Sequence, residues 1–253
     1  MTTNLSPTSP TDLETINSRL RELDELKATF VALVSHELRA PVGLLNGYLD
    51  LGLSLIEDGS DITEAKEYFV IAKKHSAQLI RIVQELTDFA RVQQNDSIKL
   101  SDLFTLRESL IQVFTLLKPA FDSKSIKPVV EISPDIAAIK YDSESLIVIF
   151  RNLLSNAAKF TPHGGRVAIT AASKGDVITL SINDTAAPIP LEKRDLIFDD
   201  FRQVENHLTR RYEGLGLGLA VARHTARALG GDITLQVRAH GNSFVVTLPR
   251  STS

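Results

Sequence analysis

The chain has 253 residues, of which 43% are hydrophobic and 23% charged, so it is long enough for two modest domains of an ordinary soluble globular protein. Its net charge of −3 gives no electrostatic reason to expect nucleic-acid binding, and the lack of cysteine excludes disulfides, thiol catalysis and cysteine metal sites. No apolar run reaches the ~18 residues that a membrane-spanning helix needs, so we expect a cytoplasmic protein without a direct membrane span.

The beginning of the chain changes character near Asp12. Residues 1–11, MTTNLSPTSPT, are rich in Ser, Thr and Pro and lack the apolar core of a signal peptide, which predicts a disordered lead. After them, apolar residues recur at spacings of three, four and seven with charged residues between them, a pattern typical of a short coiled-coil seam. The seam consists of Leu13, Ile16, Leu20, Leu23 and Phe30, and it continues as Val34, Leu38, Val42, Leu45 and Leu49.

A second long helix is predicted after the stretch EDGSD at residues 57–61, where Asp61 and Glu64 form a capping box. Its apolar face consists of Phe69, Ala72, Leu79, Val83, Leu86 and Ala90. Two amphipathic helices joined by a short turn predict a helical hairpin over residues 12–94. A lone hairpin leaves much of its apolar stripe in water, so we expect a homodimer in which two hairpins form a four-helix bundle.

The pattern changes after the polar stretch QQNDS at residues 93–97, and a second domain is predicted over residues 95–253. The predicted helices are 105–121, 142–160 and 215–229, and the predicted strands are 129–132, 166–171, 176–184, 233–237 and 243–248. Strands 166–171 and 176–184 read as a hairpin around the turn SKGD, and Gly230 and Gly231 close the last helix. Helices mixed with antiparallel strands predict an α/β sandwich whose sheet is covered on one face. The fold class is therefore α+β, a dimeric helical hairpin followed by this sandwich.

The stretch LVSHELRAPVG, residues 33–43, places His36 and Glu37 inside the first helix. His36 lies about 200° of helical rotation from the apolar residues two positions away, and so points away from the stripe. Its own face carries the small residues Ala32, Ala40, Gly43 and Gly47. Glu37 can hold a proton on the imidazole and leave the other nitrogen free as a nucleophile, and Pro41 predicts a bend in the helix. Taken alone, the pair also fits an exposed surface histidine.

Another polar stretch, FRNLLSNAAKFTP at residues 150–162, puts two amides and an ammonium on one face of a predicted helix. These groups are Asn152, Asn156 and Lys159, at spacings of four and three. They suit a hydrated Mg²⁺ ion and the phosphates that it bridges, although a solvated helix face has the same composition.

A glycine-rich stretch, GLGLGL, leads into the predicted helix at residues 215–229. Its glycines are Gly214, Gly216 and Gly218. Bare backbone N–H groups and the positive end of the helix dipole attract phosphate at such a helix start. Glycine-rich entries to helices are common, so this stretch alone is weak evidence.

In their order and spacing, these stretches together resemble the core of the sensor histidine kinases of two-component signalling. SHELRAP resembles the phosphoacceptor box, NLLSNAAKF the N box, IFDDF (residues 197–201) the F box, and GLGLGL the second glycine box of the Bergerat-type ATP-binding fold. The resemblance runs from about Leu13 to Leu248. It implies a dimerisation and histidine phosphotransfer hairpin followed by a catalytic ATP-binding domain.

The resemblance also implies residue roles, with His36 as the phosphoacceptor and Glu37 as its base or orienting group. It implies ATP and Mg²⁺ as cofactors, with Asn156 and Asn152 near the metal and Asp184 hydrogen-bonded to the adenine amino group. The implied nucleotide set is Asn152, Asn156, Lys159, Asp184, Gly214, Gly216 and Gly218. A lid over residues 199–213 carries Arg202, Arg210 and Arg211. The implied partner is the receiver domain of a response regulator, and we expect the signal to come from an upstream sensor protein.

The chain departs from the family pattern at two places. The adenine-binding glycine box, Asp-x-Gly-x-Gly in the family, reads DTAAPIP at residues 184–190, with Ala186 and Pro188 in place of the glycines. Where the backbone geometry is incompatible, these residues weaken nucleotide binding by about 1–3 kcal/mol. At Ala40, many members carry Thr or Asn; because alanine cannot position a water through its side chain, Ala40 predicts weak phosphatase activity.

Two other functions remain open at this level. A catalytically weak or inactive dimeric scaffold or nucleotide sensor has the same fold, and the altered box at residues 184–190 favours it. A Bergerat-fold ATPase of the gyrase, mismatch-repair or chaperone kind transfers phosphate to water and lacks a phosphoacceptor hairpin, so His36 argues against it. Active phosphotransfer is the function that the intact boxes favour.

Overall fold

The computed structural model describes residues 10–59, 62–93, 103–200 and 215–250, with side chains omitted at 10–20 and 22–27. The chain forms two compact units, Met1–Ile82 and Val83–Ser253, and the domain boundary after residue 94 stays a prediction. Residues 1–9 of the predicted disordered lead, Asp61, most of QQNDS, Gly214 and the lid arginines lie outside the described residues, as do the side chains of the seam from Leu13 to Leu23. The last two residues of the predicted lead, Pro10 and Thr11, are helical.

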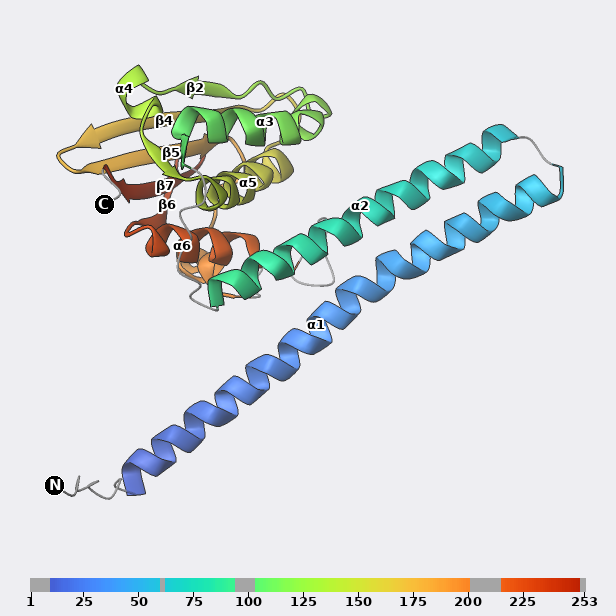
Figure 1. Cartoon of the computed structure of the whole chain (residues 1–253), viewed down its shortest axis with the longest axis horizontal. Coiled ribbons are helices and arrows are strands. Elements are labelled where there is room, and N and C mark those ends of the chain that lie inside the picture. Colours follow the sequence, from blue (N-terminus) through green and yellow to red (C-terminus); the bar gives the residue numbers. More distant parts are fainter. Residues whose placement is uncertain (1–9, 60–61, 94–102, 201–214, 251–253) are drawn as a thin grey trace. The chain divides into compact units, whose positions relative to one another are not determined.

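Two long helices form the predicted hairpin (Figure 1). Helix α1 spans Pro10–Glu57 and continues through Pro41, and helix α2 spans Ile62–Gln93. The turn between them begins at Gly59, whose φ of +70° ends the first helix. In the described parts of the chain, no helix is both long and apolar enough to cross a membrane.

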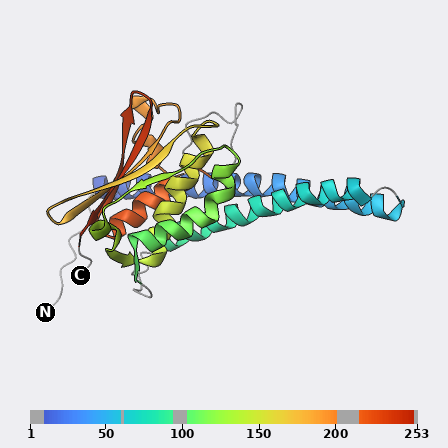
Figure 2. The same cartoon turned by 90° about the horizontal axis from the view of Figure 1, so that it is seen from above.

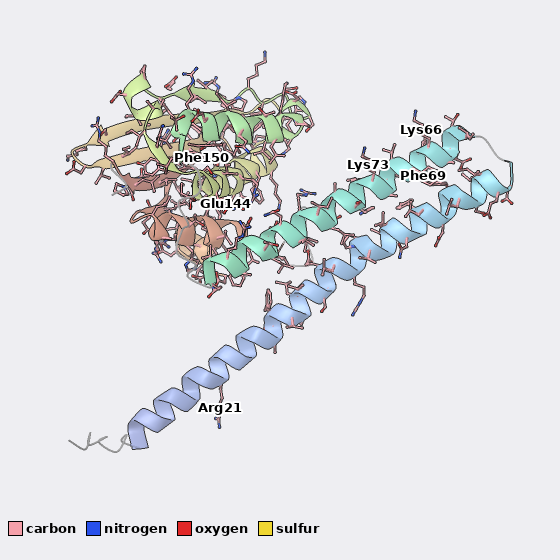
Figure 3. All side chains as sticks on the ribbon, in the orientation of Figure 1. Arg21, Lys66, Phe69, Lys73, Glu144 and Phe150 are labelled. Carbon is pink, nitrogen blue, oxygen red and sulfur yellow. The ribbon has the colours of Figure 1, made fainter. Side chains whose placement is uncertain are left out.

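Within the hairpin, a glycine of one helix packs against an aromatic ring of the other. A Cβ atom on Gly52 of α1 would lie 2.7 Å from the ring of Phe69, which points from α2 toward α1 (Figure 3). The predicted face of α2 differs at two positions, because Ala90 is exposed, and because Ile82 is 2% exposed whereas Val83 is 55% exposed. One residue corresponds to a rotation of about 100° around a helix, so a shift of the contact face by one position exchanges the two side chains.

A five-stranded sheet forms the centre of the second unit. Its strands are β2 (Val129–Glu131), β4 (Val167–Lys174), β5 (Val177–Asp184), β6 (Asp232–Arg238) and β7 (Gly241–Pro249), in the order β2-β4-β5-β7-β6. The predicted β4–β5 hairpin is confirmed, with Lys174 opposite Val177 at its turn, and β6 pairs with β7 in the same antiparallel way. Strand β2 pairs with β4 in parallel. The connection between them contains helices and returns to the end of the sheet at which β2 began. A separate pair, β1 (Leu103–Thr105) with β3 (Lys140–Asp142), is not predicted from the sequence.

Three helices cover one face of this sheet (Figure 2). They are α3 (Leu106–Asp122), α5 (Ser143–Phe160) and α6 (Gly218–Ala228), with the short elements α4 (Pro134–Ala137), η1 (Leu191–Lys193) and η2 (Leu196–Phe198) in the connections. Alternating strand residues such as Ile169, Leu180 and Val246 are fully buried beneath the helices, next to Phe150 of α5. Asp142 begins α5 by accepting a hydrogen bond from the backbone N–H of Ser145. The predicted one-faced α/β sandwich is confirmed.

Helix α6 begins three residues later than the sequence predicts. Gly216 has a φ of +75°, which no residue inside a right-handed helix adopts, so helical structure starts at Gly218 rather than Leu215. Leu215 and Leu217 are fully buried on either side of this glycine. The glycine-rich stretch is therefore an extended entry whose leucines anchor it in the core.

Tyr141 joins the β1–β3 pair to the far end of the chain and makes the fold sensitive to alkali. Its hydroxyl donates a hydrogen bond of 2.6 Å to the carbonyl oxygen of Pro249, and burial raises the pKa of Tyr141 to about 12. Above pH ~10 the unfolded chain ionises this group while the folded protein keeps it neutral, so the free energy of unfolding falls as the pH rises from ~10 to ~12.

We expect Tyr141→Phe to lower stability at neutral pH by about 1 kcal/mol and to flatten this alkaline decline. Urea unfolding of the variant and the wild type at several pH values between 7 and 11.5 measures both effects. An alkaline slope equal to that of the wild type would assign the decline to other groups.

Candidate functional site

His36 and Glu37 differ sharply in exposure although they are neighbours on α1. The His36 side chain is 77% exposed and the Glu37 side chain 6%, and 3.5 Å separates Nδ1 of His36 from Oε1 of Glu37. An Nδ1–H group facing this carboxylate leaves Nε2 without a proton and directed away from it. The exposed placement of His36 agrees with its predicted position off the apolar stripe, and the pair is arranged as a nucleophile with an orienting carboxylate.

The small residues on the His36 face leave open space within the described chain. A Cβ atom added to Gly43 or to Gly47 would have no neighbour within 4 Å, and Ala40 is exposed. A bulky group can therefore approach His36 along this face of α1.

On α5, the structure brings the predicted polar face against the start of α6. Asn152 donates a hydrogen bond of 2.9 Å from Nδ2 to the carbonyl oxygen of Val148, and its Oδ1 lies 2.8 Å from where a Cβ of Gly218 would be. Asn156 and Lys159 follow on the same half-buried face. The Asn152 nitrogen is thus used within its own helix, which leaves its oxygen and the Asn156 amide as candidate ligands.

The start of α6 has the features of a phosphate-binding helix terminus. Leu217 at the N-cap makes no side-chain hydrogen bond to the first turn, so the N–H groups there have no side-chain cap. The N–H of Leu215 donates a hydrogen bond of 3.1 Å to a carboxylate oxygen of Glu85, which belongs to the same unit. A backbone N–H of this segment already binds an anionic oxygen, as the chemistry of such a segment predicts.

Asp184 ends strand β5 as a buried carboxylate. Its Oδ1 accepts a hydrogen bond of 2.9 Å from the N–H of Ala186 and one of 3.2 Å from the side-chain amide of Asn242. Burial raises the pKa of Asp184, and these hydrogen bonds oppose the shift. The backbone N–H of Asn242 also interacts with this carboxylate. Because a carboxylate oxygen has more than one lone pair, Oδ2 can still accept a hydrogen bond from a ligand donor such as an amino group.

The altered glycine box adopts ordinary backbone geometry. Among the described residues, Ser125 is the only one other than glycine with a positive φ, so neither Ala186 nor Pro188 takes the conformation that would require glycine. Ala186 is 5% exposed and uses its N–H to hold Asp184. The strain that the substitutions would cause at positive φ is therefore absent.

In the F box, Phe198 packs into the core. Its ring lies 6.5 Å from that of Phe244 in an edge-on arrangement, and the guanidinium of Arg223 lies 4.9 Å from its centre. Arg223 is in turn paired with Asp232 at 2.9 Å. Phe201 lies outside the described residues.

Sequence reasoning missed several residues that surround these groups. Asn242 holds Asp184, and Arg151 of α5 pairs with Asp88 near the end of α2. Arg91 of α2 also pairs with Glu144 at 3.0 Å. Each partner lies more than 50 positions away in the chain, so no local pattern marks the pairs.

The residues of the second unit fit a magnesium nucleotide by four features. The uncapped start of α6 offers N–H groups to phosphate, and a side chain at Gly218 would fill the space beside Asn152. Asp184 offers a buried acceptor, and Asn156 offers an amide oxygen of the kind that hydrated Mg²⁺ accepts.

Two protein families match this chain. Residues 26–95 match the His Kinase A (phospho-acceptor) domain, and residues 141–252 match the family described as histidine kinase-, DNA gyrase B- and HSP90-like ATPase. The first match contains His36 and Glu37, and the second contains the polar face of α5, Asp184 and the start of α6.

Curated relatives align with this chain over most of its length. The chain is 29% identical over 231 residues to a sensor-like histidine kinase of Rhizobium meliloti. This alignment covers 91% of this chain and 44% of the relative. It is 34% identical over 227 residues to the sensor histidine kinase AruS of Pseudomonas aeruginosa, covering 87% of this chain and 22% of the relative. The chain thus spans less than half the length of either protein.

A solved structure has the same fold over most of the chain. Full-length ShkA, a protein solved in complex with AMPPNP, superposes with a TM-score of 0.62 and 27% identity, over 89% of this chain and 46% of ShkA.

Proposed function

Because the chain belongs to the sensor histidine kinases of two-component signalling, we propose that it transfers the γ-phosphoryl group of ATP to His36 and then to an aspartate in the receiver domain of a response regulator. The observation that carries this proposal is the exposed His36 beside the buried Glu37 carboxylate. An exposed imidazole with one oriented nitrogen is what phosphoryl transfer requires of an acceptor side chain.

In the proposed first step, Nε2 of His36 attacks the γ-phosphorus, the N–P bond forms, and the bond to the ADP oxygen breaks. Glu37 holds the proton on Nδ1 and stabilises the positive charge that develops on the imidazole. Asn156 and the oxygen of Asn152 would hold the Mg²⁺ ion, and Lys159 would lie near the phosphates. Bound Mg²⁺ supplies neutralisation of the phosphate charge.

For the nucleotide, we propose that Oδ2 of Asp184 accepts a hydrogen bond from the adenine amino group and that Gly216 and Gly218 lie along the phosphates. Asp184 is a buried carboxylate within the match to the ATPase family, and ShkA, which has the same fold, was solved with AMPPNP. We assign Gly214 to the same phosphate segment from the sequence alone.

We propose that the protein acts as a homodimer in the cytoplasm, and that an upstream sensor protein supplies its signal. Large apolar side chains stay exposed along the hairpin of a single chain, and a second hairpin would cover them. They include Val31, Leu49, Leu53, Ile56, Val70, Ile80 and Val83, each at least 36% exposed.

The inactive scaffold is the alternative function, but the sequence feature that suggested it no longer favours it. It was suggested by Ala186 and Pro188, which both occupy ordinary backbone conformations. Weak phosphatase activity from Ala40 stays a prediction, measured as slow loss of phosphate from a phosphorylated receiver domain.

The proposed function is tested by incubating the protein with Mg²⁺ and ATP labelled on the γ-phosphate. Acid-labile, base-stable label on the protein supports phosphohistidine, and its transfer to a receiver domain supports the second step. Label released only as free phosphate would support an ATPase, and nucleotide binding without any label would support the scaffold.

Glu37→Gln is expected to slow phosphorylation of His36 by about 100-fold, because the amide keeps the shape of the side chain but loses the charge that stabilises the imidazolium. Single-turnover labelling measures the rate, and the affinity for ATP should stay unchanged. Glu57→Gln at the end of α1 is the matched control, and equal rates for the two variants would remove Glu37 from the mechanism.

A further inference from the structure

Asn242, which neither the sequence motifs nor the proposed mechanism uses, lies at the point where β7 meets the altered glycine box. It is directly opposite Asp184 in the pairing of β5 with β7, and it is 2% exposed. Buried polar side chains require partners, and an amide in this position has both donors and an acceptor to satisfy.

All the polar capacity of this side chain is directed at residues 184–189. Its Nδ2 donates to Oδ1 of Asp184 at 3.2 Å and to the carbonyl oxygen of Ala187 at 3.1 Å, and its Oδ1 accepts from the N–H of Ile189 at 2.9 Å. The three partners require one orientation of the amide, because Asp184 and Ala187 offer only acceptors and Ile189 only a donor. An amide meets this pattern, whereas a carboxylate lacks the donors and a hydroxyl has only one.

The chain before Asn242 permits this close approach. Gly241 has a φ of +127°, and a Cβ atom there would lie 1.9 Å from the carbonyl oxygen of Asp184. Strand β7 therefore enters beside Asp184 with no side chain between them, and the next residue reaches the loop.

These contacts have a consequence for the base that Asp184 can bind. Asn242 and the N–H of Ala186 both hold Oδ1, so rotation of the carboxylate is restricted and Oδ2 keeps one direction. A fixed carboxylate oxygen attracts an amino group, as on adenine, and repels the carbonyl oxygen that replaces it on hypoxanthine.

We propose that Asn242 is a positioning residue that orients Asp184 and shapes the loop after it, so that it sets the preference of the site for adenine. In this chain, the hydrogen bonds of Asn242 hold the loop that contains Ala186 and Pro188 in one conformation. The inference rests on the proposed ATP site and names a residue that determines its specificity.

The test compares the dissociation constants of ATP and inosine triphosphate for the full chain and its variants, by calorimetric titration with Mg²⁺ present. Asn242→Ala is expected to weaken ATP binding about tenfold and inosine triphosphate binding less than about twofold, because only the first requires the oriented acceptor. The preference for adenine should fall accordingly.

Asn183→Ala is the matched control. This residue neighbours Asp184 on β5, and its amide donates to Ser181 of the same strand at 3.3 Å. Its substitution should leave the ratio of the two affinities unchanged.

A double variant separates positioning from general stability. If Asn242 acts through Asp184, Asn242→Ala should weaken ATP binding no further once Asp184→Ala is present. Equal losses for both nucleotides in Asn242→Ala, or additive losses in the double variant, would overturn the positioning role while leaving the ATP site standing. A wild-type chain that binds neither nucleotide would overturn the ATP site together with the inference.

Discussion

Replacement of His36 by glutamine is expected to abolish phosphorylation of the protein while leaving nucleotide affinity unchanged. Glutamine preserves the length and polarity of the side chain but has no nitrogen lone pair that can attack phosphorus. Because His36 is 77% exposed, the substitution removes little packing, and stability should change by less than about 0.5 kcal/mol. Labelling with γ-phosphate and titration with ATP measure the two properties separately.

His240→Gln provides the control, because His240 is also exposed but lies in the second unit, away from the phosphoacceptor match. It should become labelled like the wild type. Label that persists in His36→Gln and disappears in His240→Gln would identify His240, in the second unit, as the phosphoacceptor. Loss of label together with loss of ATP affinity in His36→Gln would indicate a binding role for His36.

Gly241→Ala is expected to destabilise the second unit by about 3–5 kcal/mol and to remove nucleotide binding. The added Cβ would lie 1.9 Å from the carbonyl oxygen of Asp184, and the φ of +127° is a conformation that alanine rarely adopts. Relief of this overlap requires β7 to move away from β5, which also separates Asn242 from Asp184. Urea unfolding and titration with ATP measure the two effects.

The matched control is Gly175→Ala in the turn between β4 and β5. Gly175 also has a positive φ, +60°, but a Cβ there would have no neighbour within 4 Å. The conformational penalty alone costs about 1–2 kcal/mol, so this variant should remain folded and bind ATP. Similar losses in both variants would show that φ, rather than the close approach of β7, dominates at Gly241.

Much of the architecture follows from local patterns. The spacing of apolar residues predicts both helices of the hairpin, and the turn SKGD predicts the β4–β5 hairpin that the structure contains. The short strands β1 and β3 escape prediction, because three residues are too few to show an alternating pattern. The start of α6 is predicted too early, because GLGLGL does not reveal which glycine takes a positive φ.

Part of the candidate site also follows from local patterns, and the rest depends on how the elements pack. Helical periodicity alone places Asn152, Asn156 and Lys159 on one face of α5, and sequence spacing separates His36 from the apolar stripe of α1. The contact of Asn152 with Gly218 depends on how α5 and α6 pack, which the local pattern does not specify.

The sequence by itself determined which candidate groups this protein carries: the histidine with its neighbouring carboxylate, the amide face, Asp184 and the glycine-rich stretch. These features are local, because a side chain's type and its position on a helix depend only on nearby residues. The tertiary structure alone decided that Asn242 holds Asp184 from 58 positions away. It also decided that strand β7 passes close to Asp184 at Gly241, where a side chain would not fit. Such contacts arise from strand pairing, where partners are chosen by the packing of the whole sheet and leave no mark in either segment alone.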